Sequence, residues 1–193
     1  MPFHTGLVHR ASLVLVLIDV QERLAAVMER RDDVVATVVR LVRFAELIGA
    51  PIVVTRQYPD GLGDTVPGIA HALEQAARTV SVTVVDKMSF CACDEPAFLE
   101  ALYETSRSQV VVAGMETHIC VTQTALTLAK KTYPVQVVAD ACCSRRGADH
   151  LTALDRLRTA GVVVTTAESV MYEAVSRAGT EEFKRLLAIV KEG

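Results

Sequence analysis

The sequence predicts an α/β fold built on a parallel sheet. Short runs of valine, leucine and isoleucine alternate with stretches of helical periodicity along the chain. Hydrophobic residues make up 51% of the sequence and aromatic residues only 5%, as in strands that are covered on both faces. A succession of βαβ units with right-handed crossovers indicates a doubly wound sheet.

Six apolar runs are the expected strands. They cover residues 13–18, 52–55, 80–85, 109–113, 135–139 and 162–165. Helices are expected between and after them, at 34–47, 95–104, 118–131, 147–160 and 168–191. Gly49, Pro51 and Pro134 mark ends of these elements, and QYPDGLGDTVPG is a long irregular loop rich in glycine and proline.

The length and the net charge limit the number of domains and the kinds of partner that we expect. The 193 residues suit one domain spanning 1–193, with residues 1–11 as a frayed lead-in. Lysine and arginine total 20 against 23 acidic residues, so no basic face for a nucleic acid is expected. No apolar run reaches the roughly 18 residues that a membrane span needs.

The cysteines and the first residues bear on localisation. Five cysteines without a secretory signal predict free thiols in a reducing compartment, and therefore the cytoplasm. The opening MPFHTGLVHRAS has one arginine and no acidic residue, which leaves a short organellar presequence open.

Three reactive side chains follow the carboxyl ends of predicted strands. Asp19 comes directly after the first strand, Lys87 follows the third, and the turn after the fourth leads to Cys120. In an open α/β sheet, ligands bind at this edge, near the point where strand order reverses. Alone, each residue has a structural explanation: Asp19 as a helix cap, Lys87 as a solvated lysine, Cys120 as a small apolar side chain. Their convergence favours catalysis.

The three groups suit acyl transfer. With Thr117 as N-cap, Cys120 stands at the third helical position, where the helix terminus and Lys87 are expected to lower the thiol pKa. Asp19 can take the thiol proton and return it to a leaving group, while backbone N–H groups hold an oxyanion. This chemistry predicts hydrolysis of an amide or related C–N bond through a thioester.

LIDVQ, the lysine after the third strand, AGMETHICV and VVADACCSR together resemble the isochorismatase-like cysteine hydrolases. DVQERL, TRQYPDGLGDTVP and TTAESV resemble the isochorismatase domain-containing subgroup. The resemblance implies a three-layer α/β/α fold with strand order 3-2-1-4-5-6, an Asp19–Lys87–Cys120 triad and a homo-oligomer. It also implies a cis peptide at Met115–Glu116, which we expect to present N–H groups beside the sulfur as an oxyanion hole.

One loop departs from the family pattern. Nicotinamidases of this superfamily bind a metal through an Asp and two His after the second strand. Here that loop offers Asp60, Asp64 and His71 but no D-x-H pair, so neither a metal nor nicotinamidase activity is expected. Isochorismatases, which act on a vinyl ether, need no cysteine, so Cys120 favours a small amide, imide or carbamoyl substrate and no cofactor.

Other side chains are candidates for the pocket. The expected substrate-binding residues are Tyr58, Leu62, Phe90 and His118. His118 stands two residues before Cys120, and the two side chains are expected to point in different directions, so it caps the turn or lines the pocket. Core packing explains Phe90 equally well.

Two cysteine pairs do not have the spacing of a zinc site. They are Cys91 with Cys93, and Cys142 with Cys143, and we expect ordinary buried thiols.

Two functions from different classes remain. The first is a small cysteine hydrolase acting on a small molecule. The second is a catalytically silent, oligomeric binding or scaffold protein of the same fold. We expect faster alkylation of Cys120 than of the other four cysteines in the first case and no preference in the second.

Overall fold

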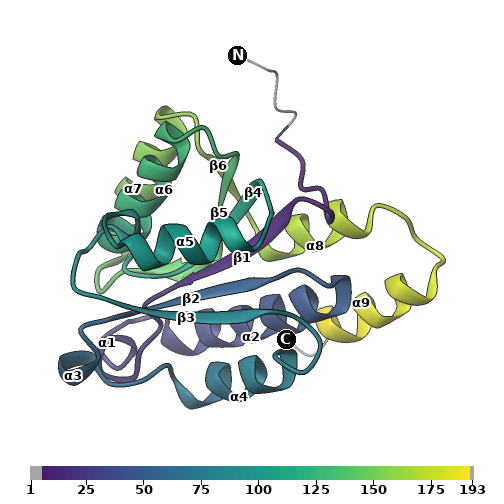
Figure 1. The fold of residues 1–193 in the computed structure, drawn as a ribbon, viewed down its shortest axis with the longest axis horizontal. Coiled ribbons are helices and arrows are strands. Elements are labelled where there is room, and N and C mark those ends of the chain that lie inside the picture. The colour runs from purple at the N-terminus through teal and green to yellow at the C-terminus, as the bar shows by residue number, and fades with distance from the viewer. Residues whose placement is uncertain (1–5, 192–193) are drawn as a thin grey trace.

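The structure is a computed structural model that describes residues 6–191, and its centre is a six-stranded parallel sheet in the order β3-β2-β1-β4-β5-β6 (Figure 1). The strands are β1 (Leu13–Ile18), β2 (Ile52–Gln57), β3 (Val82–Lys87), β4 (Gln109–Met115), β5 (Val135–Cys143) and β6 (Val163–Thr165). The predicted fold class and strand order are confirmed.

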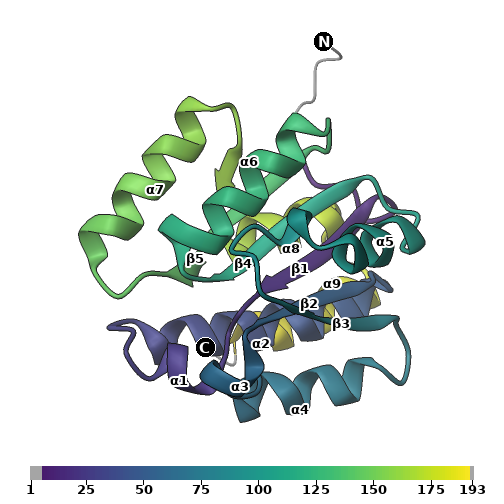
Figure 2. The same cartoon turned by 60° about the vertical axis from the view of Figure 1, so that its left-hand side comes forward.

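Helices form a layer on each side of the sheet (Figure 2). One layer contains α2 (Arg31–Ile48), α4 (Pro67–Ala76), α8 (Ala167–Val175) and α9 (Glu181–Lys191). The other contains α5 (Pro96–Glu104), α6 (Thr122–Lys130) and α7 (Gly147–Thr159). Short elements follow the strand ends, namely α1 (Glu22–Ala25), α3 (Pro59–Leu62), the 3-10 turn η1 (Ala92–Asp94) and the π-helical turn η2 (Thr117–Val121).

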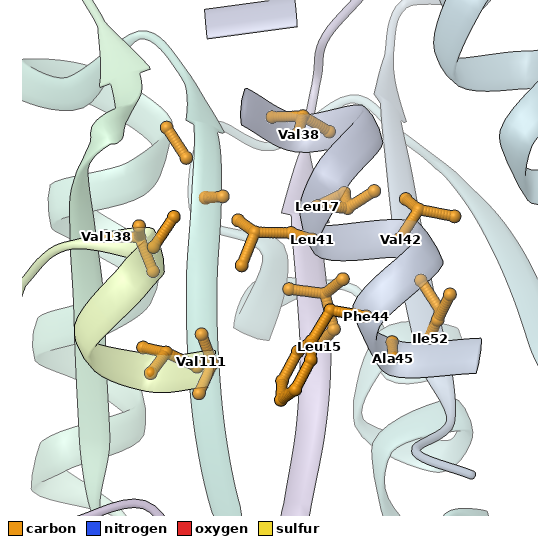
Figure 3. Packing of buried hydrophobic residues seen from close by; sticks show 14 of the residues in the cluster. Leu15, Leu17, Val38, Leu41, Val42, Phe44, Ala45, Ile52, Val111 and Val138 are labelled. Carbon is orange, nitrogen blue, oxygen red and sulfur yellow. The ribbon is translucent and has the colours of Figure 1, made fainter. Parts of the chain in front are cut away.

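Alternate residues of the central strands pack into two separate cores. On β1, Leu15 and Leu17 point toward α2, where they meet Leu41 and Phe44 (Figure 3). Val16, between them, packs into the core on the α5–α6 side. Each fully buried aliphatic side chain contributes about 1.5–3 kcal/mol to the stability of the fold. A strand that is buried on both faces therefore holds the residues that follow it in a fixed position.

Strands β2 to β5 extend further toward their carboxyl ends than the sequence predicts. Lys87 is the last residue of β3 rather than the second residue after it, because its neighbour Gln57 continues the ladder on β2. Strand β5 continues to Cys143 past an irregularity in its pairing with β4. The expected helix at 168–191 is interrupted, because Ser176 takes a left-handed conformation with φ 57°.

Residues 7–9, before β1, are docked on the domain, so the expectation of a frayed lead-in does not hold for them. Val8 is buried, and its N–H donates to Glu173 Oε2 at 2.8 Å. The side chain of Gln109, at the start of β4, accepts from His9 N and donates to Leu7 O. Residues 1–5 lie outside the described residues. Across 6–191, no helix has the length and apolar character needed to cross a membrane.

Candidate active site

Asp19 lies at the carboxyl end of β1 and is completely buried. Its backbone turns sharply there, with a left-handed φ of 52° that costs a non-glycine residue on the order of 1–3 kcal/mol. Thr55 on β2 holds it in place: the Asp19 N–H donates to Thr55 O at 3.1 Å, and Thr55 Oγ1 donates to Asp19 Oδ1 at 2.7 Å. One carboxylate oxygen is therefore already occupied.

Gly114 permits the close approach of β4 on the other side. It pairs with Ile18, has φ 129°, and any Cβ there would lie 2.0 Å from Ile18 O. Only glycine tolerates this conformation and this contact. The approach brings the turn after β4 beside Asp19.

Lys87 reaches Asp19 across β2. Its side chain is fully buried, and Nζ lies 2.7 Å from Asp19 Oδ2. The ammonium donates to Gln57 Oε1 at 2.6 Å, to Ser89 O at 3.1 Å and to Phe90 O at 3.4 Å. Three neutral acceptors thus surround the ammonium, which also contacts the Asp19 carboxylate at ion-pair distance. Within residues 6–191, Asp19 Oδ2 accepts no hydrogen bond besides this ion pair.

Two glutamines, which the sequence analysis did not single out, support this pair. Gln57 accepts from Lys87, and Gln57 Nε2 donates to Met88 O at 2.8 Å. Gln21 clamps the backbone of Gln57 from both sides, accepting from its N–H at 2.7 Å and donating to its carbonyl at 3.0 Å. Both follow the logic that identified Asp19, because they stand at strand ends in LIDVQ and VVTRQ.

Cys120 lies in η2, directly after a cis peptide bond between Met115 and Glu116. The N-cap is Glu116 and has no side-chain cap, which corrects the expectation of Thr117 as N-cap. Thr117 is instead fully buried, with its hydroxyl 2.9 Å from His150 Nδ1. The carbonyl of Glu116 accepts from the N–H groups of Ile119 and Val121.

The Cys120 thiol has a higher pKa than an ordinary cysteine, so the expectation of a lowered value is wrong. Burial raises the pKa of Cys120 to about 12, the charge of Asp19 adds to the rise, and Lys87 opposes it. Asp19 and Lys87 are thus the two charged groups that act on the thiol. At neutral pH the sulfur is therefore protonated, and it becomes a nucleophile only when a neighbour takes the proton.

The remaining expected site residues stand in the segments that follow β2, β3 and β4. Glu116 is buried, and its Oε2 pairs with Arg145 Nε at 3.2 Å. Tyr58 follows β2 and Phe90 follows β3, and both expose about half of their surface, 49% and 58%. Leu62 ends α3, which begins just after Tyr58. His118 contacts Ser144, with Nδ1 2.9 Å from Ser144 Oγ.

The acidic residues and histidine of the long loop are not brought together. Asp64 pairs with Arg56 at 2.6 Å, Asp60 lies in α3, and His71 lies on the exposed side of α4. Within the described part of the chain no cluster of three or more His, Cys, Asp or Glu side chains is arranged to hold a metal ion. A cavity of about 260 Å³ lies away from the triad, between α2, β5, α8 and α9.

The other four cysteines are free and buried. Cys91 differs from the rest, because hydrogen bonds from Cys93 and Thr127 lower its pKa to about 6. Burial raises the pKa of Cys142, and that of Cys143 to about 12.

Comparison with known proteins gives the family. The isochorismatase domain matches residues 13–169. Isochorismatase domain-containing protein 2A of Mus musculus is 37% identical over 182 residues, which are 94% of this chain and 84% of that protein. The chain belongs to the isochorismatase-domain family. The resemblance inferred from the sequence is thereby confirmed.

Solved structures of the isochorismatase fold agree. MAR1 ribonuclease from Caenorhabditis elegans has a TM-score of 0.86 at 28% identity, covering 95% of this chain and 92% of that one. The YcaC gene product of Escherichia coli, described as an octameric hydrolase of unknown specificity, has a TM-score of 0.84 at 22% identity, covering 95% and 90%. The fold and the family together support a hydrolase family for this chain.

Proposed function

We propose that the chain is a cysteine hydrolase that cleaves a C–N bond of a small amide, imide or carbamoyl compound. One observation supports this most: the buried carboxylate of Asp19, paired through Oδ2 with the Lys87 ammonium, lies beside a buried protonated thiol. Such a carboxylate can accept the proton of the thiol, because the ammonium remains to balance the charge that appears on the sulfur. A scaffold has no need of such an arrangement.

In the first half of the reaction, Asp19 Oδ2 takes the proton of Cys120 and the thiolate attacks the substrate carbonyl carbon. The tetrahedral intermediate then collapses, the C–N bond breaks, and Asp19 returns the proton to the departing nitrogen. In the second half, Asp19 takes a proton from water, the hydroxide attacks the thioester, and the C–S bond breaks. The sulfur leaves with the proton that Asp19 held, which restores the starting state.

Lys87 lowers the free-energy cost of the proton transfer in a buried site. Before the transfer its positive charge is balanced by Asp19, and after it by the Cys120 thiolate. The total charge is unchanged, and the negative charge moves only between neighbouring atoms. Because the ammonium is already fixed by Gln57 and two carbonyls, no reorganisation is needed as the charge moves.

In this proposal, backbone N–H groups at the start of η2 donate hydrogen bonds to the oxyanion of the tetrahedral intermediate. Those of Ile119 and Val121 already donate to the carbonyl of Glu116, and that of His118 donates to Ser144 Oγ at 3.4 Å. We therefore assign the role to the N–H groups of Thr117 and Cys120, in the turn that Met115 and Glu116 shape. Tyr58, Leu62 and Phe90 would form the apolar wall of the pocket.

The proposed enzyme needs neither metal nor cofactor and acts as a homo-oligomer. Large apolar side chains that are exposed in the single chain, among them Val84, Met88 and Leu151, are surface for self-association. Light scattering should give a mass above the 20.9 kDa of one chain, and activity should survive dialysis against a chelator. A pure 20.9 kDa species at micromolar concentration would contradict the first expectation, and activity restored by added metal the second.

The direct test is a screen for product release together with mass spectrometry of the intact protein. Small primary amides, cyclic imides and N-carbamoyl compounds are offered to the wild type, to Cys120→Ala and to Asp19→Asn. The proposal expects amine or ammonia release by the wild type alone, with an acyl mass increment on the peptide containing Cys120. Cys143→Ala, which removes another buried thiol near the rim, is the matched control and should retain activity.

The same screen separates the alternatives. Inertness of the wild type toward every C–N compound would favour the scaffold function. Cleavage of a vinyl ether or of a short oligoribonucleotide, retained by Cys120→Ala, would replace the proposed chemistry with that of an isochorismatase or of a ribonuclease.

A further inference from the structure

His118 and Ser144 form a hydrogen-bonded pair that the proposed reaction does not use. His118 is the second residue of η2, and Ser144 directly follows β5, so the pair joins the nucleophile's turn to the neighbouring strand end. His118 Nδ1 lies 2.9 Å from Ser144 Oγ. Ser144 is buried, whereas His118 is half-buried.

The hydroxyl of Ser144 determines which ring nitrogen carries the proton. Ser144 Oγ accepts from the backbone N–H of His118 at 3.4 Å, which uses one lone pair. Its own proton then needs an acceptor, and within residues 6–191 the contact with His118 Nδ1 is the one available. If Nδ1 carried a proton instead, the buried hydroxyl would accept twice and its own proton would be left without a partner. An unsatisfied buried donor costs about 1–3 kcal/mol, so Nδ1 is the acceptor and the proton is on Nε2.

The ring is therefore a donor with a fixed direction. Its Nδ1 edge faces the buried Ser144, so the exposed part of the side chain is the opposite edge, which includes Nε2. His118 stands two positions before Cys120 in η2 and is tied to the end of β5, whereas Lys87 ends β3. The two strand ends therefore differ in what they offer a ligand: an ammonium that protein acceptors already surround at β3, and the N–H donor of His118 beside β5.

We infer that His118, held as the Nε2–H tautomer by Ser144, is a substrate-binding donor that selects compact amides carrying a second acceptor oxygen next to the scissile carbonyl. Ser144 is then a positioning residue, which acts through His118 and does not touch the substrate. The inference rests on the proposed function for the identity of the scissile bond, but the tautomer and the binding of an acceptor do not depend on turnover.

The neighbouring pair of Thr117 and His150 provides an internal reference. Thr117 Oγ1 lies 2.9 Å from His150 Nδ1, so this pair has the same chemistry. Both residues are buried, however, and His150 has a lowered pKa because of burial and the nearby Arg30. It has no exposed donor edge, and a change at Ser144 should leave its ring signals unchanged.

The first measurement is the tautomeric state of the histidines by ¹⁵N NMR on histidine-labelled protein. The wild type should show His118 with an unprotonated Nδ1 and a protonated Nε2. Ser144→Ala should convert His118 to a mixture of tautomers and leave His150 unmoved, and Ser144→Thr, which keeps the hydroxyl, should restore the wild-type pattern. A protonated Nδ1 in the neutral wild-type ring, or identical His118 signals in wild type and Ser144→Ala, overturns the inference.

The second measurement is binding without turnover, in the Cys120→Ala background. Oxamate carries an amide and a second acceptor group, and acetamide carries the amide alone. Oxamate should move the His118 Nε2 signal and bind more tightly than acetamide. Ser144→Ala should weaken oxamate binding by about 12- to 160-fold, the equivalent of one hydrogen bond to a charged group, because the second acceptor of oxamate is a carboxylate. Equal binding of the two probes, or an unmoved His118 signal at saturation, overturns it.

The kinetic measurement separates this inference from the proposed function. On an active amide with a second acceptor, Ser144→Ala should raise KM with kcat nearly unchanged, because an interaction present in both ground and transition states is lost. If the wild type hydrolyses no amide but the NMR and oxamate results are as expected, the proposed reaction is wrong and the role of His118 as a binding donor is supported. If the wild type is active and Ser144→Ala changes neither KM nor the His118 signals, the role of His118 as a donor is wrong and the proposed reaction is supported.

Discussion

Cys120 and Cys91 are equally hidden from solvent, since each exposes 5% of its surface, yet their surroundings have opposite effects. At Cys120, burial and the carboxylate of Asp19 raise the pKa to about 12. At Cys91, hydrogen bonds from Cys93 and Thr127 lower it to about 6. The thiol that is most ionised at rest is thus not the one with a base beside it. In this molecule, the proposed nucleophile is therefore distinguished by a base that can take its proton, Asp19, and by a positive charge that then stabilises the thiolate, Lys87. It is not distinguished by being ionised at rest.

The largest expected effect is on turnover. Cys120→Ala should lower kcat/KM on a confirmed substrate by on the order of 10⁴- to 10⁶-fold, whereas Cys91→Ala should change it less than about twofold. Asp19→Asn, alone or combined with Cys120→Ala, should fall to the same residual level because the groups act as a unit. Steady-state kinetics on folded variants, verified by circular dichroism, measure the effect. Equal losses at Cys120 and Cys91 would remove the distinction between the two thiols.

A second effect concerns stability, since buried charges lie beside Cys120 and not beside Cys91. Lys87→Met leaves Asp19 buried and unpaired, so the free energy of unfolding should fall by about 3–5 kcal/mol. Arg56→Met removes two more exposed pairs, with Asp86 and with Asp64, and should cost only about 0.4–2 kcal/mol. Urea denaturation of both variants gives the two values. Similar small losses would mean that the Asp19–Lys87 pair is not the buried unit described above.

Much of this site follows from strand ends alone. The runs LVLVLI and QVVVAG are apolar at every position because both sheet faces are covered, so their ends are visible in the sequence. Asp19 and Cys120 could therefore be placed at one edge although a hundred residues separate them. Gln21 and Gln57 were missed, because a polar residue at a strand end does not itself reveal what it clamps.

The pKa of Cys120 could not be predicted in the same way. A helix terminus and a lysine are visible in the sequence, and both favour a thiolate. The opposing effects, burial and the charge of Asp19, depend on how closely the folded chain brings Cys120 to Asp19. Likewise, the proton on His118 is determined by Ser144, which lies 26 residues away in sequence.

Alkylation tests the contrast between the two thiols directly and revises the expectation that Cys120 reacts first. Near pH 7 most of Cys91 should be thiolate, against a very small fraction of Cys120. The lower intrinsic nucleophilicity of an acidic thiolate offsets part of this difference and leaves Cys91 about 100-fold faster with iodoacetamide. Peptide mass spectrometry across pH should show Cys91 labelling rise through pH 6 and level off, while Cys120 labelling keeps rising to alkaline pH. Dominant labelling of Cys120 at pH 7 would mean that its thiolate is already formed at rest.

The smallest effect is expected at the apolar wall beside Cys120, a feature that Cys91 lacks. Phe90 follows β3, its carbonyl accepts from Lys87, and its ring is 58% exposed. Phe90→Ala keeps the carbonyl and removes the ring, so it should raise KM by about 3- to 10-fold through lost apolar contact and leave kcat nearly unchanged. Tyr103→Ala is the matched control. Tyr103 is also an exposed aromatic residue, with 81% of its surface exposed, but it lies near the end of α5. There the chain leads into the start of β4, at the edge of the sheet opposite to the site. A fall in kcat for Phe90→Ala would instead indicate that the ring holds the segment that fixes Lys87, and an equal change in KM for Tyr103→Ala would remove Phe90 from the substrate pocket.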